Sequence, residues 1–158
     1  MARHSELVKI PRIDRYVTKL ALGTAPMGGW PATVAESDAE ATILAATDSG
    51  INYFDTAPLY GYGRSEVRLG RALRASKRDF VISTKVGRVL NETSQPDKEF
   101  FKDADPTKES VYDWSAEGIK RSLEESLERL GIDHVDILLM HDCEDYLEQA
   151  INVAYPVL

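Results

Sequence analysis

Three residues whose side chains can hold or transfer protons stand at the ends of apolar segments. Asp55 closes INYFD, Lys85 lies near the end of FVISTKV, and His141 follows VDILLM. Tyr60 lies five residues after Asp55, in a glycine-rich segment. An ammonium favours the phenolate form of a neighbouring tyrosine, and a carboxylate can hold that ammonium in place. We therefore predict a proton relay of Tyr60, Lys85 and Asp55, with Tyr60 as general acid or base.

His141 extends this chemistry, because an imidazole can donate a hydrogen bond to a carbonyl or hydroxyl oxygen and orient it. Such a set suits proton transfer at an oxygen whose carbon gains or loses hydride. Each residue alone has a structural explanation: a turn cap, a surface tyrosine, a paired lysine or a structural histidine. All four explanations together require four coincidences at one edge, so we favour the catalytic interpretation.

The elements that would position these residues alternate between strand and helix. Apolar segments predict strands at 20–25, 51–55, 80–86 and 135–142. Amphipathic segments predict helices at 37–49, 65–76, 115–131 and 145–155. This order is typical of an α/β protein with a parallel sheet covered by helices. We predict a (β/α)₈ barrel of which about the first four βα units are present, with the strand ends meeting at one mouth.

Residues at the helix ends sharpen these boundaries. Ser37 and Glu40 have the spacing of a capping box, and Gly50 marks the end of that helix. Ser115 is the expected N-cap of the third helix, which Gly131 ends, and Ser65 is the expected start of the second. One long connection, residues 87–114, is polar and interrupted by prolines. We expect this loop to contribute to a substrate pocket rather than to the core.

Composition narrows the functional classes. The chain has 158 residues, 43% hydrophobic and 28% charged, as expected for one soluble domain, and its net charge of -7 argues against nucleic acid or an anionic membrane as partner. Cys143 is the only cysteine, which excludes an intrachain disulfide and favours a reducing, cytoplasmic location. No signal peptide and no stretch of eighteen apolar residues is present, so no membrane segment is expected.

Other motifs are weaker. GTAPMGG (23–29) matches no phosphate-loop spacing, although it would lie at the mouth near a cofactor. GYGRSE (61–66) could bind an anion, but a plain loop-to-helix turn explains it better. Cys143 is best explained as a passive thiol. We predict no metal site, because His141 and Asp142 are too few ligands and the other histidines lie elsewhere.

Three segments together resemble one family. NYFDTAPLYGYGRSEVRLGRAL, ISTKVG and SLEESLERLGIDHVDILLMHD are similar to motifs of the aldo-keto reductases, oxidoreductases on a (β/α)₈ barrel that use NADP or NAD. The resemblance runs from about residue 18 to the end. It implies a catalytic tetrad at Asp55, Tyr60, Lys85 and His141, and cofactor contacts at Gly23, Thr24 and Asp55. It also implies a small carbonyl, alcohol or sugar as substrate.

Within the family, PLYGYGRSE, TKVGR and MHD are most similar to one bacterial branch. That branch includes L-fucose or D-threo-aldose 1-dehydrogenases and pyridoxal 4-dehydrogenase, and its members oxidise an aldose or hemiacetal to a lactone. The resemblance therefore implies sugar or alcohol dehydrogenase chemistry.

Length sets this chain apart from the family, because a complete barrel has about 250 residues. We expect residues 1–158 to be the N-terminal half of one barrel domain, with residues 1–17 as an N-terminal segment. The resemblance places the main cofactor-binding segments in the other half, so we expect this half to be inactive alone. Two alternatives remain: a non-catalytic, cofactor-sensing regulatory subunit, and a half-barrel that self-associates through its open sheet edges.

Overall fold

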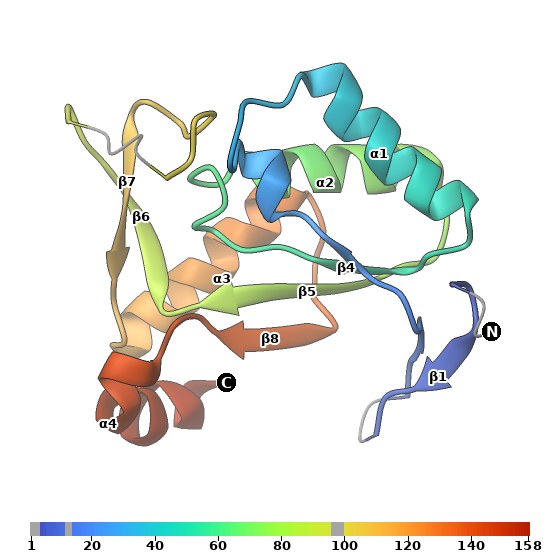
Figure 1. Cartoon of the computed structure of the whole chain (residues 1–158). Coiled ribbons are helices and arrows are strands. Elements are labelled where there is room, and N and C mark those ends of the chain that lie inside the picture. The colour runs from blue at the N-terminus through green and yellow to red at the C-terminus, as the bar shows by residue number, and fades with distance from the viewer. Residues whose placement is uncertain (1–3, 12–13, 96–99) are drawn as a thin grey trace.

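The computed structural model describes residues 4–11, 14–95 and 100–158. Its first element is a short antiparallel hairpin of β1 (Leu7–Lys9) and β2 (Tyr16–Thr18), which the sequence interpretation left as an N-terminal segment. The hairpin is separate from the main sheet (Figure 1). Asn52, just before the second sheet strand, joins the two parts: its side-chain oxygen accepts from the Thr18 amide at 2.8 Å.

A four-stranded parallel sheet forms the centre of the molecule. Its strands are β3 (Leu22–Gly23), β4 (Tyr53–Asp55), β5 (Val81–Val86) and β8 (Ile137–Met140), in the order β3-β4-β5-β8. All four predicted strands are present, each shorter than its apolar segment. The fold class is therefore confirmed as a partial (β/α)₈ barrel. β3 and β8 are the outer strands, and self-association through them stays a prediction.

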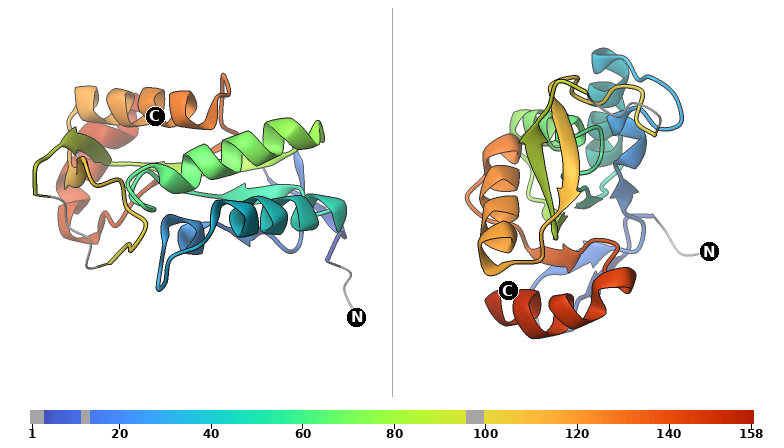
Figure 2. Two further views of the ribbon diagram at one scale, coloured as in Figure 1. Left: turned by 90° about the horizontal axis from the view of Figure 1, so that it is seen from above. Right: turned by 90° about the vertical axis from the view of Figure 1, so that its left-hand side faces the viewer.

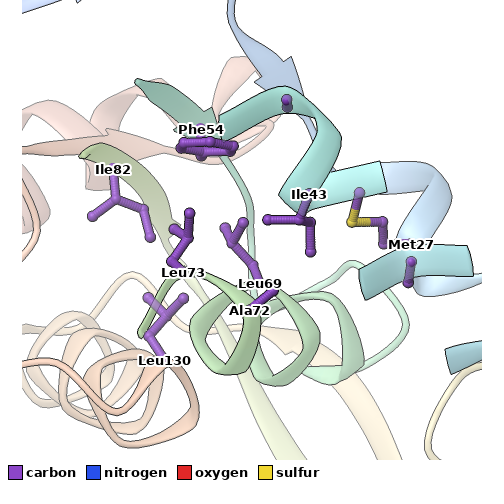
Figure 3. Packing of buried hydrophobic residues seen from close by; sticks show 10 residues of the cluster. Met27, Ile43, Phe54, Leu69, Ala72, Leu73, Ile82 and Leu130 are labelled. Atoms are coloured by element: carbon purple, nitrogen blue, oxygen red, sulfur yellow. The ribbon is translucent and has the colours of Figure 1, made fainter. Parts of the chain in front are cut away.

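Three helices lie in a row on one face of this sheet: α1 (Glu36–Asp48), α2 (Arg64–Ser76) and α3 (Ala116–Leu130) (Figure 2). Between sheet and helices lies the main core, built from Phe54 and Ile82 of the strands and from Ile43, Leu69 and Leu130 of the helices (Figure 3). Within the described ranges, no helix is long and apolar enough to cross a membrane.

The helix ends confirm three of the predicted signals, among them Gly50, which follows the end of α1 with φ 85°, and correct two others. Ser115 caps α3 by accepting from the Gly118 amide at 3.0 Å, and Gly131 ends it with φ 65°. The capping box of Ser37 and Glu40 was wrong, because α1 begins at Glu36 without a side-chain cap. The first turn is held instead by ion pairs from the Glu36 carboxylate to α2.

The start of α2 also differs from the prediction. The helix begins at Arg64 after Gly63, whose φ is 90°. Ser65 caps nothing; its fully buried hydroxyl donates to the Thr24 hydroxyl at 2.7 Å. Ser65 therefore ties the start of α2 to the loop after β3 rather than to its own helix.

Residues 87–114 are less irregular than expected. They contain a hairpin of β6 (Arg88–Glu92) and β7 (Lys108–Tyr112), which stands at the carboxyl ends of β5 and β8 (Figure 1). Leu90, Phe101 and Trp114 are buried. The expectation that this connection lies outside the core was therefore wrong, because Trp114 packs with Val86 and Ile119 in one core cluster and Leu90 and Phe101 belong to another.

The last predicted helix, 145–155, is present as a mixed helical segment. It consists of a 3₁₀ turn (η2, Glu144–Tyr146), one α turn (α4, Leu147–Gln149), a π-helical stretch (η3, Ala150–Ala154) and a final 3₁₀ turn (η4, Tyr155–Val157). Pro156 has no amide hydrogen to donate to a preceding carbonyl, so a regular α-helix does not continue through it.

Candidate active site

The four predicted catalytic residues meet at the carboxyl edge of the parallel sheet. Asp55 is the last residue of β4, Lys85 the penultimate residue of β5, and His141 directly follows β8. Tyr60 reaches this edge from the loop between β4 and α2. Since neighbouring parallel strands end at the same edge, residues far apart in the sequence become neighbours here.

Asp55 and Lys85 form the most ordered pair of the site. The Lys85 Nζ donates to Asp55 Oδ2 at 2.7 Å and to the Thr56 carbonyl at 2.8 Å. The other oxygen, Asp55 Oδ1, accepts from the Ser83 hydroxyl at 2.7 Å. The sequence interpretation missed Ser83, although its position two residues before Lys85 places both side chains on one side of β5.

Tyr60 lies against this pair through its ring. The Lys85 Nζ is 4.8 Å from the centroid of the Tyr60 ring, a cation–π contact. No described residue hydrogen-bonds to the Tyr60 hydroxyl, so the predicted relay consists here of an ion pair beneath an aromatic ring. Catalytic hydrogen bonds commonly form only when the reactants are bound, and the hydroxyl remains available for such a bond.

Glycines hold the Tyr60 loop in place. A Cβ on Gly28, in the turn η1 (Ala25–Gly28), would lie 2.4 Å from the backbone nitrogen of Gly61. Gly61 itself has φ 65°, in the left-handed region that favours glycine. The glycines of GTAPMGG and GYGRSE therefore allow two backbones to touch, which fixes the loop that carries Tyr60.

His141 is buried beside Tyr60. The two rings meet edge to face, with centroids 5.8 Å apart and an interplanar angle of 89°. The His141 amide donates to the Val86 carbonyl at 3.0 Å, but its buried Nδ1 has no hydrogen-bond partner among the described residues. Burial lowers the pKa of His141 to about 4, and the charges of Lys85 and Arg88 add to this effect against Asp142 and Asp55. The imidazole is therefore neutral near pH 7.

The predicted cofactor contacts differ in accessibility. Gly23 pairs with Asp55 in the sheet and has open space where a side chain would project, so a ligand can approach its backbone. Thr24 is fully buried, and its hydroxyl donates to the Asp55 carbonyl at 2.8 Å. Thr24 therefore positions the end of β4, and cofactor contact at Gly23, Thr24 and Asp55 stays a prediction.

The part of the chain that the structure describes, residues 4–11, 14–95 and 100–158, bears on metal binding and on Cys143. It contains no group of three or more His, Cys, Asp or Glu residues arranged to hold a metal ion. Cys143 is a half-buried free thiol that packs against the core around Val86 and Trp114. A passive role for this thiol stays a prediction.

The comparison with protein families agrees with this arrangement. Residues 19–154, most of the chain and all four site residues, match the Aldo/keto reductase family. The chain belongs to that family. The resemblance drawn from the three sequence motifs is thereby confirmed.

Two curated aldo-keto reductase relatives resemble the chain closely. Pyridoxal 4-dehydrogenase from Microbacterium luteolum is 42% identical over 150 residues, which cover 87% of this chain and 43% of that protein. D-threo-aldose 1-dehydrogenase from a Pseudomonas species is 41% identical over 151 residues, covering 90% and 45%. The similarity to the predicted branch is confirmed, and the chain spans less than half the length of these relatives.

Solved structures show the same fold. Glycerol dehydrogenase from Gluconobacter oxydans has a TM-score of 0.69 and 33% identity, covering 87% of this chain and 39% of that one. An aldo/keto reductase from Klebsiella pneumoniae in complex with NADP and acetate has a TM-score of 0.55 and 28% identity, covering 81% and 36%.

Proposed function

We propose that this chain provides the proton-transfer residues of an NAD(P)-dependent oxidoreductase that interconverts a hydroxyl group and a carbonyl. The proposal rests on one observation: four residues lie together at the carboxyl edge of the parallel sheet, namely Asp55, Lys85, Tyr60 and His141. A lysine 2.7 Å from a carboxylate and 4.8 Å from a tyrosine ring centroid is an arrangement that suits acid–base chemistry.

In this proposal Tyr60 is the general acid or base, and its hydroxyl gives a proton to, or takes one from, the substrate oxygen. Lys85 stabilises the phenolate through its positive charge, and Asp55 holds Lys85 in place. His141, neutral near pH 7, donates an N–H to the same substrate oxygen and orients it.

The site also fits a nicotinamide cofactor. NAD or NADP, when bound, supplies or accepts the hydride at the substrate carbon. Two features support the fit: the open space beside Gly23, and the buried His141 Nδ1, which no described residue satisfies. Gly23 and Asp55 would contact the cofactor at the edge of the sheet, and the Klebsiella relative, which binds NADP, supports that choice.

We infer that the substrate is a small alcohol or sugar. The names of the relatives support this class, since one acts on D-threo-aldoses and a structural neighbour on glycerol. A purely regulatory role is less well supported, because all four acid–base residues are present and adjacent. We expect residues 1–158 alone to show no turnover, because catalysis depends on a cofactor held in near-attack geometry.

The test joins residues 1–154 to the C-terminal part of pyridoxal 4-dehydrogenase from Microbacterium luteolum and measures NAD(P)-linked oxidation of sugars and alcohols. Tyr60→Phe in this chimera should lower turnover by about 10²–10⁴-fold, the range for a lost general acid or base, with little change in cofactor binding. Tyr16→Phe is the control, because Tyr16 is exposed on β2. Turnover by Tyr60→Phe equal to that of the control would exclude Tyr60 as the proton-transfer group.

A further inference from the structure

A cavity of about 330 Å³ lies beside the candidate active site, and the proposed proton transfer uses none of its polar groups. Phe100 and Phe101 form an aromatic part of its wall, and Arg88, Ser110 and Asp142 form a polar part. The cavity borders the site, because the Phe101 ring in its wall lies 6.1 Å from the Tyr60 ring and Asp142 directly follows His141.

Arg88 is the main polar group of this cavity. Its guanidinium stacks on the Tyr112 ring, 3.9 Å from the centroid, and its Nη2 donates to the Tyr112 hydroxyl and to Asp142 Oδ2, the latter at 3.0 Å. Its buried Nε has no hydrogen-bond partner among the described residues. Arg88 is thus held in one orientation while part of its donor capacity is unused.

Asp142 supplies an acceptor beside these donors. Its backbone has φ 50°, which is uncommon for a residue other than glycine and directs the chain sharply after His141. Its side chain is 51% exposed, so a ligand can reach it. Ser110 adds a buried hydroxyl that has no partner among the described residues. A buried polar group without a partner is unfavourable unless a ligand or water satisfies it.

The polar groups of the cavity suit a hydroxyl group better than an anion or an alkyl chain. A hydroxyl both donates and accepts, so it can bond to an arginine and a carboxylate that lie side by side. An anionic group suits the cavity less well, because the Asp142 carboxylate already balances the Arg88 charge and would repel it. An unsubstituted alkyl chain would leave the Arg88 Nε and the Ser110 hydroxyl without a partner.

We propose that Arg88 and Asp142 form a specificity subsite that binds a hydroxyl group on a substrate carbon other than the reacting one. Phe100 and Phe101 pack against the carbon face of the same substrate. The ligand class is a neutral, polyhydroxylated ring or chain. The proposal rests on the proposed function, since it assumes that the reacting carbon lies at Tyr60.

The test measures binding to the 158-residue chain without cofactor or turnover. The ¹⁵N-labelled chain is titrated with the full set of D- and L-aldopentoses, with propan-1-ol and with propionate, while the Arg88 Nε–H signal is followed by NMR. At least one aldopentose should shift this signal saturably, whereas propan-1-ol and propionate should not. Saturation transfer to the sugar provides a second measure of binding.

Two variants test the residues. Arg88→Gln and Asp142→Asn should each weaken aldopentose binding about tenfold or more, the effect of a lost charge-assisted hydrogen bond. If Arg88→Gln does not fold, Asp142→Asn still tests the subsite, because Asp142 is half exposed and its substitution should not disturb the fold. Arg78→Gln is the matched control, since Arg78 is an exposed arginine paired with Asp48 before β5, away from the cavity.

Three results would overturn the subsite: no shift with any aldopentose, unchanged binding in both variants, or propionate binding that Asp142→Asn strengthens. The last result would indicate an anion site. Failure here is distinct from failure of the proposed function, because a chain can bind the sugar through Arg88 even if Tyr60→Phe leaves turnover unchanged.

Discussion

The two sides of the candidate active site differ in how completely their polar groups are bonded. On the side of Asp55 and Lys85, both carboxylate oxygens accept a hydrogen bond and the ammonium has two acceptors. On the side of His141 and Arg88, buried polar atoms of His141, Arg88 and Ser110 have no partner in the described parts of the chain. We call the first side complete, because each polar side-chain atom of Asp55 and Lys85 has a partner without a ligand, and the second side incomplete.

Position in the sheet explains this difference. Asp55 and Ser83 are paired residues on adjacent strands, so the sheet itself supplies the bond between their side chains. His141 follows the outer strand β8, and Arg88 begins a hairpin beyond the sheet. We infer that the first side is preorganised for chemistry, whereas the second is completed by what binds.

The largest change in the free energy of unfolding is expected at the ion pair of Arg129 and Glu66, which contacts β5 through Thr84. Glu66 is fully buried; it accepts from Arg129 Nε at 2.6 Å and from the Thr84 hydroxyl, next to Lys85, at 2.8 Å. Arg129→Met would leave the carboxylate buried without its cation. We expect a loss of about 3–5 kcal/mol in the free energy of unfolding, measured by urea denaturation.

The control for this variant removes both charges. Arg129→Met combined with Glu66→Leu should recover most of the lost stability, because no unpaired charge then remains in the interior. If the single variant is as stable as the unchanged chain, β5 is not held by this charge balance, and the completeness of the Asp55 side has another cause.

The next largest expected effect is a dependence of the free energy of unfolding on pH, and it comes from His141 on the incomplete side. The folded pKa of His141 is lowered from 6.5 to about 4, first by burial and then by the charges of Lys85 and Arg88. Between these pH values the unfolded chain binds a proton that the folded chain does not, so stability rises with pH across this window. The contribution is complete above about pH 6.5 and is lost as the pH falls towards 4, a change of about 3 kcal/mol.

Unfolding free energies measured between pH 4 and pH 7 check this expectation. His141→Asn should flatten the slope in that window, because the substituted side chain takes up no proton. An equal slope in the unchanged chain and in His141→Asn would show that His141 takes up its proton in the folded chain as readily as in the unfolded one.

The sequence predicted the residues at the strand ends better than the pair Arg88 and Asp142. The apolar segments end in Asp55, Lys85 and His141, and parallel strands necessarily bring such ends together. Arg88 and Asp142 carry no comparable signal, because they meet through a hairpin within residues 87–114, where the sequence predicts a loop. The prediction that Ser37 caps α1 failed for a related reason. The helix begins at Glu36, whose carboxylate forms ion pairs with α2, and a local sequence pattern does not reveal such contacts.

The smallest expected effect compares two serines, one on each side of the site. Ser83→Ala removes the donor to Asp55 Oδ1, and because Asp55 is partly exposed, water can replace part of that bond. We expect a loss of about 1 kcal/mol in the free energy of unfolding. Ser110→Ala removes a buried hydroxyl that has no partner among the described residues, so its stability should be unchanged or slightly higher.

Both serines lie on strands, β5 and β7, so the two substitutions match in chemistry and in type of element. Urea denaturation of both variants at one pH gives the comparison directly. A similar loss at both positions would mean that the Ser110 hydroxyl is bonded in solution, and the cavity beside Arg88 would then be as complete as the Asp55 side. A loss of stability at Ser83 alone would support the division of the site into two sides. On one side the sheet supplies the hydrogen bonds, and on the other the polar groups have no partner until a ligand binds.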